Sequence, residues 1–333
     1  MLDLSALQRE AAATGFRTES LEKVIRLLDV LEGIRSHPFL KSRLALKGGT
    51  ALNLFVLNVP RLSVDIDLNY IGTAEREPML AERPQVELAL QAVCGRLGLQ
   101  TRRVPGEHAG GKWRLTYMGV DGRPGTLEVD VNFLLRTPLW PPGSADSRRI
   151  GSFGVSGVPM LNLHELVAGK LAALFGRSAS RDLFDVRGLL AAGPFDTERL
   201  RLGFVSYGGM SRRDWREVSL DEVQADPRDV GQRLLPLLRA GAGPARADLV
   251  VWSAALASES RELLSAVLPL RAEEVTFLEL LNERGEIRPD LLTGDAAMQA
   301  LLRAHPGLRW KALNVRRHRG IDGGDGGAQG TVD

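Results

Sequence analysis

Cysteine and histidine are scarce in this sequence. Its 333 residues include one cysteine, Cys94, so no disulfide can form within the chain, and a reducing cytoplasm is the expected location. The five histidines are scattered, and none has the spacing of a zinc site. Any bound metal ion should therefore have oxygen ligands, and the predicted cofactor is Mg²⁺ or Mn²⁺.

Long hydrophobic runs are also missing. The apolar segments end well short of the roughly 18 residues that span a bilayer, and the start of the chain lacks the pattern of a secretory signal. No membrane partner is therefore expected. Apolar residues make up 44% of the sequence and charged residues 25%, which predicts a folded globular protein whose length suits two domains.

Charge of one sign is not in large excess. The formal net charge of +2 is too small to establish a nucleic-acid partner. Five lysines and arginines nevertheless lie between Arg309 and Arg319, and this segment either binds phosphate through the arginine forks or forms a solvated, frayed tail. Trp310 in the same segment could stack on a base, but burial in a helical core is the favoured prediction.

The apolar periodicity predicts an α+β N-terminal half and helices beyond it. Residues 1–36 and 85–98 should be helical, and strands are expected at 62–70, 113–120 and 126–135. Further helices are expected at 162–175, 181–192, 228–240, 259–268 and 273–284. The proline-rich segment 138–147 is the candidate linker, so the predicted domains are residues 1–150 and 151–318, followed by a disordered glycine-rich tail at 319–333.

A strand with alternating acidic residues is the most informative motif. Ser63, Asp65, Asp67 and Asn69 occupy every second position, with apolar residues between them, so their side chains should share one face of the strand. The two carboxylates are about 6–7 Å apart along the backbone, close enough to bind a cation between them. Such a pair is costly without nearby positive charge, because like charges raise each other's pKa.

A glycine loop precedes this strand. Lys47, Gly48, Gly49 and Thr50 stand at the start of a short helix expected at residues 51–55. Glycines let backbone N–H groups approach a ligand, and a helix N-terminus favours phosphate. Alone, a Gly-Gly pair is usually a turn and an Asp-x-Asp strand is often a solvated face. Together they predict a nucleotide site with metal-bridged phosphates.

A second acidic strand follows. Glu128, Asp130 and Asn132 alternate there with apolar residues. Asp130 could supply the third carboxylate of a two-metal site, or Glu128 and Asp130 could simply line a solvated sheet face. We favour the catalytic interpretation of Asp130.

The helical half contains a lysine within an apolar stripe. Lys170 lies seven residues after Leu163, almost directly above it on the predicted helix. A lysine on an inward face needs an anionic partner, which Asp182, Asp185 or a triphosphate could provide. The lysine either forms a purely structural ion pair or offsets phosphate charge during catalysis. We favour catalysis, with Asp185 as the functional aspartate that orients Lys170.

These motifs resemble a known family. The segments 47–52 and 61–68 are similar to the nucleotidyltransferase toxins of the AbiEii/AbiGii family, which includes the MenT toxins. By this resemblance Ser63, Asp65 and Asp67 match the serine and the two acidic positions of the family's active-site strand.

The resemblance continues in the helical half. Lys170, Arg177 and the segment 181–185 match a lysine, an arginine and an Arg-Asp-x-x-Asp-like helix of the family, and the similarity spans roughly residues 40–315. It implies an α+β fold, with the minimal nucleotidyltransferase (DNA polymerase beta-like) mixed sheet flanked by helices and followed by a mainly helical domain.

The activity implied is metal-dependent transfer of a nucleoside monophosphate from an NTP to RNA. The tRNA 3′ end would be the acceptor, translation would be blocked, and a cognate antitoxin would be a partner. The alternatives are transfer to a small molecule or a protein hydroxyl, and a non-catalytic binding module. The predicted site comprises the catalytic residues Asp65, Asp67, Lys170 and Asp185, the nucleotide-binding residues Lys47, Gly48, Gly49, Thr50, Ser63 and Lys170, and the metal ligands Asp65, Asp67 and Asp130.

Overall fold

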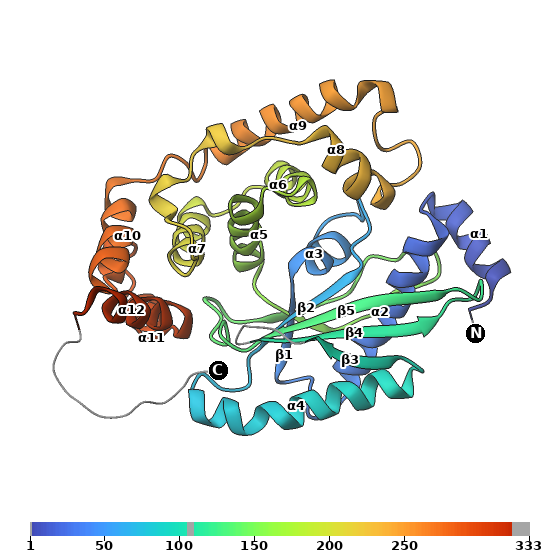
Figure 1. Ribbon diagram of the computed structural model, residues 1–333, viewed down its shortest axis with the longest axis horizontal. Coiled ribbons are helices and arrows are strands. Elements are labelled where there is room, and N and C mark those ends of the chain that lie inside the picture. Colours follow the sequence, from blue (N-terminus) through green and yellow to red (C-terminus); the bar gives the residue numbers. More distant parts are fainter. Residues whose placement is uncertain (1, 105–109, 322–333) are drawn as a thin grey trace.

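The computed structural model describes residues 2–104 and 110–321. Within these residues the centre is a seven-stranded mixed sheet with the strand order β3-β4-β5-β2-β1-β7-β6 (Figure 1). The strands are β1 (Leu44–Lys47), β2 (Asp65–Tyr70), β3 (Gln100–Val104), β4 (Gly110–Met118), β5 (Pro124–Asn132), β6 (Gly143–Ala145) and β7 (Val158–Met160). The pairs β2–β5 and β1–β7 are parallel, and the other neighbours are antiparallel.

Helices cover both faces of the sheet. On one side lie α2 (Thr18–Ser36) and α4 (Arg76–Arg96), and on the other α3 (Gly48–Thr50), α5 (Leu163–Arg177) and α6 (Ser180–Ala192) (Figure 1). The remaining helices are α1 (Leu4–Thr14), α7 (Thr197–Gly209), α8 (Pro227–Asp229), α9 (Leu249–Leu264), α10 (Ala272–Arg284), α11 (Ala296–Ala304) and α12 (Pro306–Arg319). Short π or 3₁₀ turns occupy Ala51–Val56, Trp215–Glu217, Leu220–Glu222, Val230–Leu234, Leu235–Leu237, Arg246–Asp248 and Pro289–Leu291. The predicted mixed sheet with flanking helices is confirmed.

The register of β2 and β5 places acidic residues side by side. Parallel pairing sets Asp65 opposite Glu128 and Asp67 opposite Asp130. Because directly paired residues of neighbouring strands point to the same face, all four carboxylates lie on one face of the sheet. The apolar positions between them are buried on the opposite face, so the alternation in the sequence sets the orientation of the acidic side chains.

The strand predicted from Leu62 begins three residues later, at Asp65. Arg61 forms a β-bridge with Leu238, and the Leu62 amide donates a hydrogen bond to the Leu237 carbonyl. The backbone at residues 61–62 thus pairs with the helical half of the molecule. Ser63 consequently lies in the approach to β2 and not within the strand.

Other differences from the predicted elements have local causes. The single helix expected at residues 1–36 is divided at Gly15, whose left-handed φ of 75° ends α1. The candidate linker at 138–147 contains β6, which pairs with β7, and Leu139 and Trp140 in the same segment are buried. The short strands β1, β3, β6 and β7 escape prediction because each is too brief to show a clear alternation.

Trp310 lies at the surface with 42% of its side chain exposed, so the predicted burial of this residue is wrong. Helix α12 packs through Leu308 and Ala312, which are buried. Trp310 stands midway between them in sequence, and a helix turns by about 100° per residue, so its side chain points away from that face.

A single apolar cluster connects the two halves of the chain. It runs from Leu7 to Ala312 and includes residues of the sheet and of the surrounding helices. The sheet itself crosses residue 150, because β7 pairs with β1. The domain boundary at residue 150 stays a prediction. The predicted disordered tail lies, from residue 322 onward, outside the described residues. None of the helices described has the length and hydropathy needed to cross a membrane.

Candidate active site

A cleft of about 220 Å³ lies between the acidic face of the sheet and helices α5 and α6. Five acidic and five basic side chains contribute to its lining. The lining residues are Gly49, Arg61, Ser63, Asp65, Ile66, Asp67, Lys112, Glu128, Asp130, Lys170, Arg177, Arg181 and Asp182. Most of the acidic residues are on β2 and β5, whereas three of the basic residues belong to α5 and α6, so the cleft has walls of opposite charge.

The carboxylates on the sheet side of the cleft, here called the acidic wall, are unfavourable in their ionised form. Burial raises the pKa of Asp65, and the neighbouring carboxylate of Asp67 raises it further. Burial also raises the pKa of Asp130, where the charge of Lys47 acts in the opposite direction. These carboxylates therefore lie where a bound cation would relieve both their repulsion and their loss of solvent.

Glu128 differs from the other acidic residues because it already has basic partners. Its carboxylate is 2.7 Å from Lys112 Nζ and 3.4 Å from Arg114 Nη2, and the hydrogen bond from Lys112 contributes most to lowering the pKa of Glu128. Within the described residues, the side chains of Asp65, Asp67 and Asp130 form no ion pair of this kind. This contrast favours Asp130 over Glu128 as a metal ligand.

The donor set suits a hard divalent cation. Three carboxylates without ion-pair partners meet on adjacent strands, and Mg²⁺ and Mn²⁺ prefer carboxylate oxygens. In the conformation described for residues 2–104 and 110–321, no group of three or more histidine, cysteine or acidic side chains is arranged to hold a metal ion. The chemistry of the residues, rather than a preformed cage, is what fits the metal.

The glycine loop packs directly against the acidic strand. Gly48 has a φ of 73°, and a Cβ atom at this position would lie 2.1 Å from Asp67 Oδ2. A Cβ at Gly49 would lie 2.9 Å from Ser63 Oγ, so both glycines are needed for the close approach of loop and strand. Thr50 is buried and donates a hydrogen bond of 2.5 Å to the Asp65 carbonyl.

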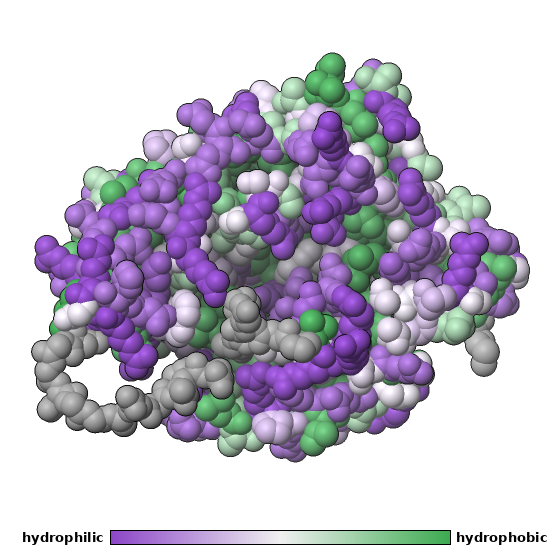
Figure 2. Space-filling model, viewed as in Figure 1, coloured by the Kyte–Doolittle hydropathy of each residue, from purple (hydrophilic) through white to green (hydrophobic). Residues whose placement is uncertain are grey.

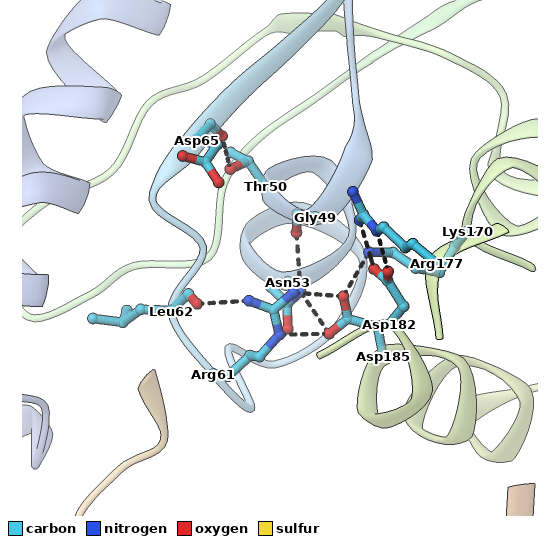
Figure 3. A network of polar contacts seen from close by, with 10 residues as sticks. All are labelled: Gly49, Thr50, Asn53, Arg61, Leu62, Asp65, Lys170, Arg177, Asp182 and Asp185. Atoms are coloured by element: carbon cyan, nitrogen blue, oxygen red, sulfur yellow. Dashed lines mark hydrogen bonds and ion pairs between the residues drawn. The ribbon is translucent and has the colours of Figure 1, made fainter. Parts of the chain in front are cut away.

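A buried ionic network supports the basic wall (Figure 3). Lys170 Nζ is 2.9 Å from carboxylate oxygens of both Asp182 and Asp185. Asp185 also accepts hydrogen bonds of 2.7 and 2.6 Å from Arg61 and one of 3.0 Å from Asn53. Although complete burial opposes ionisation, Arg61 and then Lys170 hold the pKa of Asp185 well below its usual value. The carboxylate is thus ionised and satisfied on all sides.

The two aspartates of α6 occupy different positions. Asp182 lines the cleft and is also bound by Arg177 through hydrogen bonds of 2.5 and 2.9 Å, whereas Asp185 lies beneath Lys170 and does not reach the cleft. The structure therefore places Asp185 where it can hold both Lys170 and Arg61.

Several predicted site residues meet in the cleft and others do not. Gly49, Ser63, Asp65, Asp67, Asp130 and Lys170 line it. Lys47, Gly48, Thr50 and Asp185 are not among the lining residues. Asn69, predicted to share the acidic face, is fully buried and does not reach the cleft.

Basic residues of the cleft are the main omission of the sequence prediction. Arg61, Lys112, Arg177 and Arg181 line it without having been assigned to the site. The position of Arg61, directly before the acidic strand, was the available signal. Its partner Asp185 lies 124 residues away in the chain, so the pairing could not be predicted from local pattern.

Comparison with known proteins shows similarity in both sequence and structure. The sequence profile of the family described as "Nucleotidyl transferase AbiEii toxin, Type IV TA system" matches residues 29–313. Among solved structures, MenT4, a nucleotidyltransferase toxin from Mycobacterium tuberculosis H37Rv, is similar with a TM-score of 0.60 and 20% sequence identity, over 93% of this chain and 99% of that chain. At this identity the second likeness shows the fold alone. No curated protein sequence matches the chain.

Proposed function

The chain belongs to the AbiEii nucleotidyltransferase toxin family, and from this membership we propose that it transfers a nucleoside monophosphate from an NTP to the 3′ end of tRNA. A nucleotide added there blocks aminoacylation and so arrests translation. Because the family is one of toxin–antitoxin systems, a cognate antitoxin is implied as a partner.

The observation that carries this proposal is the cleft with walls of opposite charge. A nucleoside triphosphate bound with metal ions presents both kinds of charge, cations and phosphate oxygens, to its binding site. The carboxylates of β2 and β5 suit the cations, and the basic residues of α5 and α6 suit the phosphates. Positioning and charge stabilisation of this kind account for most of the catalysis in phosphoryl transfer.

Each wall has a defined role in the proposal. Asp65, Asp67 and Asp130 would hold Mg²⁺ or Mn²⁺. When bound, these ions would polarise the reacting phosphate and offset its charge. In the reaction, the oxygen of the acceptor hydroxyl forms a bond to the α-phosphorus, the bond to the β-phosphate oxygen breaks, pyrophosphate leaves, and the hydroxyl proton passes to solvent.

The glycine loop and the basic wall would bind the triphosphate. Gly48 and Gly49 would allow the loop backbone to lie close to the phosphates, with Lys47 and Ser63 beside them, while Thr50 holds the loop against β2. Lys170 would offset phosphate charge from the opposite wall. Asp185 holds the Lys170 ammonium group in place through their 2.9 Å ion pair, which would make Asp185 a positioning residue.

The proposal is tested by incubating the purified protein with Mg²⁺, total tRNA and each α-labelled NTP in turn. Wild-type protein should label tRNA, and Asp65→Asn should reduce the rate at least about a thousandfold, because one metal ligand is lost at nearly constant shape. Glu279→Gln, a change at an exposed position of α10, is the matched control and should retain wild-type activity. Thermal unfolding should show that both variants fold.

The other outcomes separate the alternatives. Label found in protein or in small molecules, but not in RNA, would retain the transferase and exclude the tRNA acceptor. Measurable NTP binding without transfer to any acceptor would indicate a non-catalytic binding module. Transfer that persists in Asp65→Asn would show that the proposed metal site is wrong.

A further inference from the structure

A second cavity of the described residues is larger than the catalytic cleft. It is a groove of about 1500 Å³ between the first turns of α4, the segment after β5, and α12. Figure 1 shows α4 along the bottom of the molecule and α12 at its left, and in Figure 2 hydrophilic residues gather on that left side. Eight arginines but only two glutamates line the groove.

The positive charge of this groove is only partly neutralised by the protein. Arg136 donates hydrogen bonds to the carbonyls of Ala74 and Phe133 and has no carboxylate partner within the described residues. Arg309 and Arg317 are exposed. Among the residues that the structure describes, their side chains form neither an ion pair nor a hydrogen bond. Unpaired guanidinium groups at a concave surface bind polyanions well, because each fork donates two hydrogen bonds to phosphate.

An exposed aromatic residue stands beside these charges. Trp310 is 42% exposed, follows Arg309 directly and lines the groove. Unpaired arginines together with an exposed tryptophan are the side chains that hold the backbone and stack the bases of single-stranded nucleic acid. Arginine and tryptophan also anchor protein interfaces, so the choice of RNA over a protein partner rests on the proposed function.

The groove lies near the catalytic cleft, beyond the ends of the two strands that carry the acidic residues. Asp67 and Asp130 lie in the cleft, and the same strands lead on to Ala74 and Phe133 at the groove. Phe133 follows Asp130 by three positions, a distance of about 10 Å in an extended backbone. A nucleic acid whose end reacts in the cleft would therefore reach the groove within a few nucleotides.

We propose that Arg136, Arg309, Trp310 and Arg317, here called the arginine groove, bind the sugar–phosphate backbone of the acceptor RNA a few nucleotides from its reacting end. The identity of the polyanion rests on the proposed function. The location of the binding surface rests on the charges, the exposed tryptophan and the nearness to the cleft.

The test is equilibrium binding of fluorescent tRNA to the full-length protein without NTP. Replacement of both Arg309 and Arg317 by Gln should weaken binding about tenfold and lower the slope of log affinity against log salt by about 2. Trp310→Ala should weaken binding with little change in that slope. The matched control replaces two exposed arginines outside both sites, Arg96 and Arg246, by Gln and should remain within about twofold of wild type.

Further readouts distinguish failure of this inference from failure of the proposed function. Binding of a fluorescent NTP should be unchanged in the groove variants, which shows an intact cleft. If the groove variants bind tRNA as tightly as wild type, or if wild type binds no tRNA, the inference is overturned. Unchanged tRNA binding with lost binding of polyglutamate would identify a protein-docking surface instead. Groove-dependent tRNA binding without nucleotide transfer would support the groove and contradict the proposed reaction.

Discussion

Carboxylates of this protein differ in pKa because their neighbours differ. Asp65 and Asp130 are partly buried without ion-pair partners, and the pKa of each is raised, whereas Asp185 lies between Arg61 and Lys170 and its pKa is lowered. An aspartate on the sheet side of the cleft is thus suited to binding a cation, whereas Asp185 is ionised by its basic neighbours. This difference separates the proposed metal ligands from the residue that positions Lys170.

Glu165 is a third case and predicts a pH dependence of stability. It is buried at the start of α5, where it accepts hydrogen bonds of 3.0 Å from the Leu139 amide and 2.9 Å from the Tyr207 hydroxyl. Burial raises the pKa of Glu165 to about 7 from an ordinary 4.5, so between these values the folded protein binds more protons than the unfolded chain. The free energy of unfolding should therefore fall as pH rises from 4.5 through 7, by at most about 3 kcal/mol from this group.

Urea denaturation across this pH range checks the prediction. Glu165→Gln keeps the shape without the charge, so it should flatten the pH dependence and unfold at higher urea than wild type above pH 7. Glu279→Gln on the surface of α10 should keep the wild-type slope. An unchanged slope in Glu165→Gln would assign the pH dependence to other groups.

Among the structural elements, the contact between the glycine loop and β2 gives the sharpest mutational prediction. Gly48→Ala places a Cβ 2.1 Å from Asp67 Oδ2, whereas Gly98→Ala, with a similar positive φ of 71°, meets nothing within 4 Å. Both variants should lose about 1 kcal/mol of stability through backbone strain. Only Gly48→Ala should also lose most of its transfer activity, because it displaces a proposed metal ligand.

The two glycine variants are compared by urea denaturation and by label transfer under identical conditions. Equal activity in both would show that the acidic strand tolerates the displacement. Equal loss in both would assign the effect to backbone strain alone.

Individual helices and strands could be predicted from the sequence more readily than the contacts between them. The alternation of Asp65 and Asp67 with apolar residues predicts their shared face, and the apolar stripe around Lys170 predicts an inward lysine with an acidic partner. Both patterns are local. Ser63 was placed within the strand because no local signal shows that the backbone at Arg61 and Leu62 pairs with residues 237–238. The basic wall depends on how α5 and α6 pack on the sheet, and that packing is tertiary.

The whole molecule is held together across its midpoint by the sheet and by buried charge. β7 pairs with β1, and Arg61 of the first half binds Asp185 of the second with both side chains almost fully buried. An uncompensated buried arginine typically costs about 3–5 kcal/mol, a large part of the stability of a single domain.

A fragment of residues 1–150 tests how far the predicted first domain is independent. Without β7, α5 and α6 it lacks one neighbour of β1 and the partner of Arg61, so we expect no cooperative unfolding transition. Urea denaturation and the dispersion of amide NMR signals, measured beside the full chain, provide the readout. A well-dispersed spectrum with cooperative unfolding would instead establish residues 1–150 as an autonomous domain.

The balance of charge in the catalytic cleft has a consequence for repeated turnover. Five acidic and five basic side chains line it, and a metal-bound nucleotide also carries little net charge. Entry of substrate and exit of product would then leave the field outside the cleft almost unchanged, and solvent ions screen what remains beyond about 10 Å. The electrostatic attraction between the arginine groove and the RNA backbone should therefore be nearly the same with the cleft filled or empty. Such electrostatic independence would let nucleotides exchange in the cleft while the RNA backbone stays bound.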